Sequence, residues 1–272
     1  MWRYLRHDVG DRRVIHAHYR GHGRSAQPRE KTRLSIADLA DDMDAVLEDA
    51  GVERAVLAGH SMGVQVALET YRRHPSRVVG LILLCGAPSH PLRTFRGTGT
   101  LERVLPEIER WILRAPHAIN RLKRVLMPTR LAFEVAGRLE INRDLIEVGD
   151  FMPYLEGLAR IDVRLFVAML AEAGRHSADD VLPTIDVPTL VVAGARDGFT
   201  PPDRSRAMAD AIPGSELLLV EDGTHTAPIE RPQVVDEAVA RFLTTAVDLG
   251  FAKQKSGVKE GEGDGDARLV TR

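Results

Sequence analysis

The stretch Ala55-Val56-Leu57-Ala58-Gly59-His60-Ser61-Met62-Gly63 joins a short apolar run to a helical pattern through a serine that lies between two glycines. Residues 55–58 predict a buried strand, and the apolar spacing over 62–73 predicts a helix that ends before Pro75. A Gly-x-Ser-x-Gly turn between a strand and a helix is sharp and strained, and it raises the serine hydroxyl above the sheet. Ser61 is therefore a candidate nucleophile. The Met62 N–H, at the start of the helix, is a candidate donor to an oxyanion.

Two residues that could activate Ser61 follow later strands. A serine hydroxyl is a weak nucleophile until a base takes its proton, and the base needs an orienting acid. Asp197 comes shortly after the apolar run 188–193, and His225 follows the run 216–220. Each residue alone is also typical of an ordinary turn or surface loop. Their order and their positions after successive strands nevertheless predict a triad of Ser61, Asp197 and His225.

Short apolar runs alternate with helical patterns along both ends of the chain, which is typical of a parallel sheet flanked by helices. Between residues 90 and 180 no strand pattern occurs, only amphipathic helical patterns interrupted by prolines. Such an insertion predicts a helical cap above the carboxyl edge of the strands, where ligands bind in α/β folds. The remaining predicted strands cover 14–19 and 78–84, and the remaining predicted helices cover 35–50, 203–211 and 234–247.

The fold class is therefore α/β, with a mostly parallel sheet and an inserted all-helical cap. The expected organisation is a first core segment at 1–89, the helical cap at 90–182 and a second core segment at 183–250. The last residues, 251–272, are rich in glycine and charge and have few apolar residues. They cannot bury enough surface to offset their ordering entropy, so we expect a disordered tail.

Composition and charge limit the kinds of molecule that the chain is expected to bind. The chain has 272 residues, 44% hydrophobic and 28% charged, with a formal net charge of -2, so nucleic acid is not an expected partner. Cys85 is the single cysteine and lies in an apolar run, where it is interpreted as a small buried hydrophobe. No apolar stretch is long enough for a membrane span, and residues 1–8 lack the hydrophobic segment of a signal peptide. A cytoplasmic location is the default expectation.

No cofactor or metal site is predicted. Gly97-Thr98-Gly99 lies in the insertion and Gly21-His22-Gly23 lacks a third glycine, so neither is a dinucleotide fingerprint. His16 and His18 share one face of the first predicted strand, but no nearby cysteine or acidic cluster completes a metal site.

The early part of the insertion is basic. Between Pro91 and Arg130 nine cations stand against three acids, with Trp111 and several aliphatic residues interleaved. The favoured interpretation is a solvated cationic face over an apolar inner face. Contact with an anionic membrane, or attraction of an anionic substrate, is the alternative. Apolar residues of the later insertion are expected to form its underside and to favour a hydrophobic substrate. They are Phe151, Met152, Tyr154, Leu155, Phe166 and Met169.

These motifs together resemble the α/β-hydrolase superfamily. The matching pieces are Tyr19–Ser25, Gly59–Gly63, Gly194–Asp197 with Pro201-Pro202 after it, and Gly223–His225. The branch that they resemble contains small bacterial esterases, carbon–carbon bond hydrolases, lactonases, haloperoxidase-like enzymes and relatives of proline iminopeptidase. The resemblance spans about residues 13–245 apart from the cap. It is specific for the superfamily and says little about the substrate.

One departure from the family pattern concerns the oxyanion hole. Family members begin with further strands and a His-Gly loop whose backbone N–H supplies a second donor, and no such segment precedes Trp2. The absent strand would lie between the strands at Val14 and Ala55. Two explanations are open: the true start lies upstream, or the sheet has closed up in a degenerate hydrolase. Loss of one oxyanion donor typically lowers turnover by about 100- to 1000-fold.

The resemblance implies hydrolysis of an ester, thioester, lactone or activated carbon–carbon bond through an acyl-enzyme at Ser61. His225 would serve as general base and then general acid, and Asp197 would orient it. Two alternatives remain open. One is a catalytically impaired binding protein that keeps the pocket, and the other is an acyltransferase or perhydrolase that uses the same triad. The expected ligand is a small hydrophobic molecule, and the sequence predicts no oligomeric state.

Overall fold

A four-stranded parallel sheet forms the centre of the molecule. The computed structural model describes residues 2, 4–5, 9–28, 34–139 and 141–248. The strands stand in the order β1-β2-β3-β4, and each pairs in parallel with the next. Their bounds are Ala55–His60, Val78–Leu84, Thr189–Gly194 and Glu216–Val220. Parallel strands place their carboxyl ends at one edge, so the loops that carry Ser61, Asp197 and His225 meet there.

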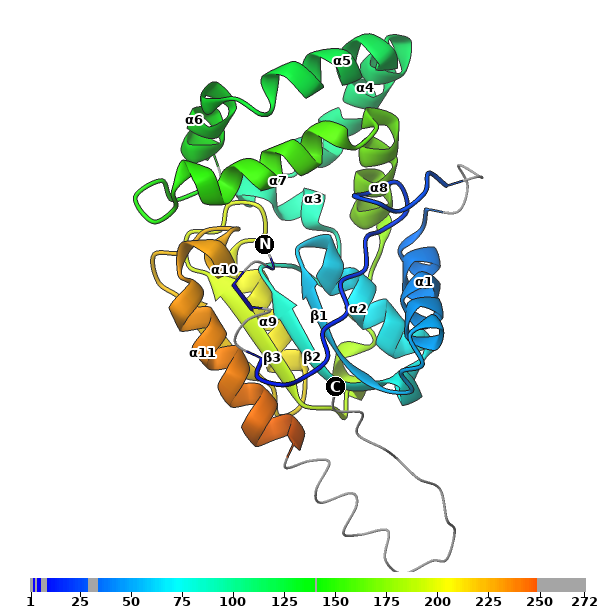
Figure 1. Cartoon of the computed structure of the whole chain (residues 1–272), viewed down its shortest axis with the longest axis vertical. Helices are drawn as coiled ribbons and strands as arrows, with labels where there is room; N and C mark the ends of the chain where they lie inside the picture. Colours follow the sequence, from blue (N-terminus) through cyan, green and yellow to red (C-terminus); the bar gives the residue numbers. More distant parts are fainter. Residues whose placement is uncertain (1, 3, 6–8, 29–33, 140, 249–272) are drawn as a thin grey trace, which may run out of the picture.

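Helices connect and cover these strands (Figure 1). Those of the core are α1 (Ile36–Asp49), α2 (Met62–Arg73), α9 (Pro202–Ala211), α10 (Ala227–Glu230) and α11 (Pro232–Phe242), which continues as a π-helix over Leu243–Asp248. Between β2 and β3 come α3 (Pro91–Thr94), α4 (Thr100–Arg114), α5 (Pro116–Leu126), α6 (Arg130–Leu139), α7 (Val148–Arg160) and α8 (Val163–Arg175). Short 3₁₀ turns lie at Pro75–Arg77, Phe95–Gly97 and Leu182–Thr184. Within the described residues, the segment predicted to be wholly helical contains no strand.

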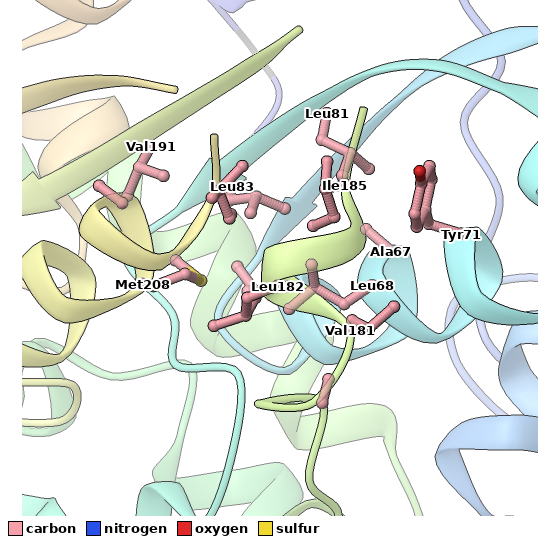
Figure 2. Close-up of a cluster of buried hydrophobic side chains, with 14 of the residues drawn as sticks. Ala67, Leu68, Tyr71, Leu81, Leu83, Val181, Leu182, Ile185, Val191 and Met208 are labelled. Carbon is pink, nitrogen blue, oxygen red and sulfur yellow. The ribbon is translucent and has the colours of Figure 1, made fainter. Parts of the chain in front are cut away.

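The sheet is covered on both faces because alternate side chains of a strand point in opposite directions. Leu81 and Leu83 of β2 pack with α2, α9 and the segment at residues 181–185 (Figure 2). Ile82 and Leu84 pack on the opposite face with α11. All seven residues of β2 are buried, as the continuous apolar run predicted. The resulting two-sided core holds the strand ends rigidly.

The first predicted strand, Val14–Tyr19, is not a strand. Residues 12–19 run without ladder hydrogen bonds, and Val14 and Ile15 are 44% and 37% exposed. In the described sheet β1 is an edge strand that pairs with β2 alone. A β-branched run forms a strand only when a neighbouring strand satisfies its backbone groups, and none of the described strands pairs with this run.

The helices between β2 and β3 lie beyond the carboxyl edge of the sheet (Figure 1). They contact the core through α8, whose Leu165 and Met169 join Ile36 and Leu39 of α1 in one apolar cluster. Within the described residues no helix is long and apolar enough to cross a membrane. The predicted disordered tail, 251–272, lies outside the described residues.

Candidate active site

Ser61 lies in a strained turn between β1 and α2. Its backbone has φ 57° and ψ -119°, a positive φ that a residue with a side chain rarely adopts. A Cβ on Gly59 would lie 2.1 Å from the Gly63 carbonyl oxygen, and one on Gly86 would lie 2.6 Å from the Ser61 carbonyl oxygen. The chain can therefore turn this sharply only with glycine at these positions. Steric crowding therefore explains why the first position of the motif is glycine.

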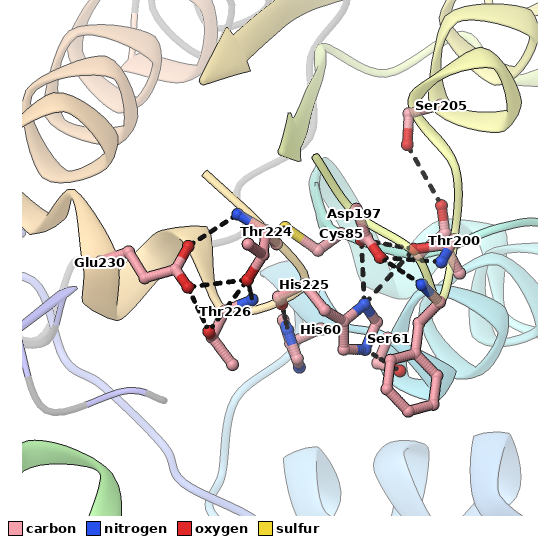
Figure 3. A network of polar contacts seen from close by, with 12 residues as sticks. His60, Ser61, Cys85, Asp197, Thr200, Ser205, Thr224, His225, Thr226 and Glu230 are labelled. Carbon is pink, nitrogen blue, oxygen red and sulfur yellow. Dashed lines mark hydrogen bonds and ion pairs between the residues drawn. The ribbon is translucent and has the colours of Figure 1, made fainter. Parts of the chain in front are cut away.

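The three residues predicted to act together are in hydrogen-bond contact (Figure 3). His225 Nε2 lies 2.9 Å from Ser61 Oγ, and His225 Nδ1 lies 2.9 Å from Asp197 Oδ2. A carboxylate can only accept, so Nδ1 carries the proton and Nε2 is left to accept from the serine hydroxyl. The side chains of His225 and Asp197 are 10% and 1% exposed. The geometry is that of a nucleophile, a base and an orienting acid.

Asp197 is fixed by its own loop. Its Oδ1 accepts from the backbone N–H groups of Phe199 at 2.8 Å and Thr200 at 2.9 Å. The Thr200 hydroxyl donates to Oδ2 at 2.8 Å and also approaches His225 Nδ1 at 3.5 Å. A buried carboxylate that accepts from this many donors is held in one orientation. The supporting role of Thr200 was not predicted from the sequence.

A second buried carboxylate, Glu230 on α10, holds the loop that carries His225. It accepts from the Thr224 N–H and hydroxyl, both at 2.7 Å, and from the Thr226 hydroxyl at 2.9 Å. It also accepts from the backbone N–H of Asn142, which belongs to the helical insertion, at 2.7 Å. Glu230 thus binds both neighbours of His225 and ties them to the insertion. No motif in the sequence pointed to Glu230.

His60, next to Ser61, contacts the backbone of His225. Its Nε2 lies 2.8 Å from the His225 carbonyl oxygen, and the two imidazole rings are 5.0 Å apart. Burial lowers the pKa of His60 to about 3, so its ring is neutral at physiological pH. A neutral ring can donate Nε2–H to the carbonyl without adding positive charge beside the base. We therefore interpret His60 as a structural residue of the cleft wall.

Aromatic rings form one wall beside the base. The Phe199 ring lies 4.9 Å from the His225 ring, and the Phe95 ring lies 4.8 Å from that of Phe199. Phe199 comes from the loop of Asp197, whereas Phe95 comes from the start of the insertion. The residues predicted to form an apolar underside of the insertion differ in burial. Phe151, Leu155 and Met169 are buried in apolar clusters, whereas Tyr154 and Phe166 are 37% and 40% exposed.

Met62 begins α2, directly after the nucleophile. The first N–H groups of a helix have no acceptor within the helix, and they lie at the positive end of its dipole. The Met62 N–H therefore remains the candidate oxyanion donor that the sequence suggested. Among the described residues no group of three or more His, Cys, Asp or Glu could hold a metal ion. Cys85 is fully buried, which raises the pKa of its thiol and suits a residue that only packs.

Comparison with known proteins identifies the family. The α/β hydrolase fold family matches residues 1–101, and the TAP-like protein family matches residues 168–247. The candidate carbamate hydrolase RutD of Azorhizobium caulinodans is 32% identical over 84% of this chain and 80% of its own length. The chain belongs to the α/β-hydrolase superfamily and is a hydrolase.

Solved structures agree with this assignment. A thermophilic esterase from Thermogutta terrifontis is 25% identical, with a TM-score of 0.60 over 84% of this chain and 78% of the esterase. Est816, described as an N-acyl homoserine lactone degrading enzyme, is 28% identical, with a TM-score of 0.57 over 81% of this chain and 78% of Est816. The names of these relatives give different classes of substrate, so the family alone does not select a substrate.

Proposed function

We propose that this hydrolase cleaves carboxylic esters, thioesters, lactones or activated carbon–carbon bonds of small hydrophobic substrates through an acyl-enzyme at Ser61. The observation that carries the proposal is the continuous chain of two 2.9 Å hydrogen bonds from Ser61 through His225 to Asp197. Names of relatives support the same chemistry, because carbamates, esters and lactones all present a carbonyl carbon next to a leaving oxygen or nitrogen.

In acylation, His225 Nε2 takes the hydroxyl proton as Ser61 Oγ attacks the substrate carbonyl carbon. The Met62 N–H donates to the oxygen that becomes negative. The imidazolium then gives its proton to the leaving group, and the acyl group stays on Oγ. In deacylation, water donates a proton to the same nitrogen as it attacks the acyl carbon. The imidazolium then returns that proton to Ser61 Oγ as the bond between Oγ and the acyl carbon breaks. Asp197 keeps Nδ1 protonated throughout and balances the imidazolium charge.

The apolar wall favours a hydrophobic acyl or ring group. Phe199 and Phe95 place aromatic surface directly beside the base, and Phe199 keeps 37% of its own surface exposed. An apolar group bound there would be removed from water at about 25 cal/mol per Å² of buried area. A screen of p-nitrophenyl esters by acyl length should therefore show kcat/KM rising from acetate to medium chains. Phe199→Ala should flatten that dependence.

A fluorophosphonate probe tests the nucleophile. The wild type should gain one covalent adduct by intact mass, and Ser61→Ala should gain none. Ser205 offers a matched serine control, because it is buried and its hydroxyl donates to the Gly86 carbonyl oxygen. Ser205→Ala should therefore still label. A folded wild type that is not labelled would contradict the acyl-enzyme and favour the impaired binding protein.

Product analysis separates hydrolysis from acyl transfer. With a p-nitrophenyl ester in buffer that contains added alcohol or peroxide, a hydrolase releases mainly free acid. An acyltransferase or perhydrolase gives the transferred ester or the peracid as its main product. We expect free acid to dominate, and a dominant transfer product would replace the proposed reaction with the alternative.

A further inference from the structure

The outer helices of the insertion expose apolar side chains that the core does not use. Trp111 on α4, Leu122 and Val125 on α5 and Leu131 on α6 are 66%, 58%, 64% and 68% exposed. The sequence alone favoured an apolar inner face here, and for Trp111, Leu122 and Val125 that interpretation is wrong. More than half of the large apolar side chains exposed by the described residues belong to α4, α5 and α6.

Two of these helices, α4 and α6, carry apolar residues on an inner and an outer side. On α4, Leu105 and Ile112 pack with residues of α8, whereas Val104, Ile108 and Trp111 follow helical spacing on an exposed stripe. On α6, Phe133 packs toward α7, and Leu131 is exposed. The inner residues account for the fold of the insertion. The helices that carry the outer residues lie at the end of the molecule that is distant from the sheet (Figure 1). A concentration of exposed large apolar side chains on one group of helices is typical of an interaction site.

Arginines border the exposed stripes. Arg103, Arg110 and Arg114 share one side of α4, and Arg121 and Arg124 lie on α5, all exposed. The Arg114 guanidinium stands 4.6 Å from the Trp111 ring centroid, so a cation and an amphipathic ring lie together. Lys123 is different, because it points inward and donates to the Ile161 carbonyl. The surface charge is therefore carried by guanidinium groups, which suit phosphate.

We propose that α4, α5 and α6 dock peripherally on an anionic lipid bilayer. The apolar stripes would enter the boundary between headgroups and acyl chains, while the arginines bind lipid phosphates. Charge favours this occupant: residues 100–139, which span α4, α5 and α6, carry eight cations against four acids, in a chain of net charge -2. A second copy of the same face would bring two strongly positive surfaces together, which is unfavourable. The docking does not depend on the catalytic chemistry.

Vesicle flotation with the full chain tests the proposal. Wild type should float with vesicles of phosphatidylcholine and phosphatidylglycerol and remain below vesicles of phosphatidylcholine alone. Substitution of Trp111, Leu122 and Val125 together by serine should weaken binding at least about tenfold. Arg114→Gln, Arg121→Gln and Arg124→Gln together should weaken it on the order of 100-fold, at about 1 kcal/mol for each arginine near the surface.

Controls separate docking from folding and from catalysis. Val234→Ser, which changes an exposed apolar residue on α11, should bind like wild type. Ser61→Ala should also bind like wild type, even if the proposed acyl-enzyme is wrong. Both multiple variants should retain the ester hydrolysis rate of wild type on soluble substrates, which confirms that they fold.

Four results would overturn the proposal. They are absence of binding to anionic vesicles, equal binding to neutral vesicles, binding that the multiple variants leave unchanged, and a concentration-dependent dimer that the serine variant abolishes. In a Trp2→Phe background Trp111 is the remaining indole, and its fluorescence should shift to the blue on addition of anionic vesicles. An unshifted spectrum at saturating lipid would also contradict insertion of this face.

Discussion

At the carboxyl edge of the sheet, Asp197 and Glu230 are buried and each accepts four hydrogen bonds. On the outer helices of the insertion, Trp111 and Val125 remain about two-thirds exposed. In the first region the buried carboxylates are fully paired, and in the second large apolar groups remain in water. The paired carboxylates hold the neighbouring side chains in one geometry, which a catalytic site requires. The exposed apolar side chains would gain free energy if another surface covered them.

The largest expected effect comes from the orienting acid. Asp197→Asn should lower kcat on the order of 10⁴-fold at neutral pH, because an amide can donate to Nδ1 and favour the wrong histidine tautomer. Thr200→Val removes one supporting hydroxyl and should cost far less, about tenfold. Steady-state kinetics with a soluble ester gives both values. If Asp197→Asn kept more than about a tenth of the wild-type kcat, Asp197 would not be the orienting acid.

Substitution of one leucine in the sheet and one in the outer helices compares how much each region contributes to stability. Leu83 on β2 is fully buried between the sheet and its helices, so Leu83→Ala should lower the free energy of unfolding by about 2–5 kcal/mol. Leu122 on α5 is 58% exposed, so Leu122→Ala should change it by less than about 0.5 kcal/mol. Urea unfolding of both variants measures the difference. A comparable loss for Leu122→Ala would mean that its side chain is buried in solution and that the docking face is closed.

Substitution of Glu230 tests whether the contact between the insertion and the His225 loop affects catalysis. Glu230→Ala leaves the buried Thr224 N–H without its acceptor, so we expect a loss of stability of about 1–3 kcal/mol. As a positioning residue, Glu230 should affect kcat more than KM. Glu230→Gln keeps one acceptor oxygen and should recover part of the rate. Equal kcat and KM effects, or full activity in Glu230→Ala, would reduce Glu230 to a purely structural residue.

The sequence predicted the sheet edge well because its signals are local. Each apolar run and each loop that follows it spans only a few residues, as at β2, β3 and β4. Ser61, Asp197 and His225 could therefore be assigned from their order along the chain and their positions after strands. The prediction of a strand at Val14–Tyr19 was wrong because β propensity does not indicate whether a partner strand is present.

Other features depended on contacts between distant segments. Glu230 is typical of a surface helix residue by sequence, and only the fold brings Thr224 and Asn142 onto it. Phe95 and Phe199 meet although 104 positions separate them in the chain. The outer helices have apolar residues on more than one side, so periodicity could not decide which of them pack inward. Which apolar residues pack inward is decided by tertiary contacts.

His60 should make the stability of the fold depend on pH. Its pKa is about 3 in the folded protein, mainly because burial disfavours the charged ring, against about 6.5 in an unfolded chain. Below about pH 6.5 the unfolded state therefore binds a proton that the folded state does not. The free energy of unfolding should fall as the pH is lowered from about 6.5 toward 3, by at most about 1.4 kcal/mol per pH unit. Above about pH 7 this contribution is constant.

His60→Asn isolates that contribution, since asparagine can still donate toward the His225 carbonyl and does not titrate. Urea unfolding of wild type and His60→Asn between about pH 4.5 and 7.5 should give curves that converge as the pH falls, because only the wild type loses the His60 contribution. Parallel curves would mean that the ring is solvated and titrates normally. In that case His60 would carry a positive charge beside His225 in mildly acidic solution, and the rigid, neutral environment inferred for the base would be wrong.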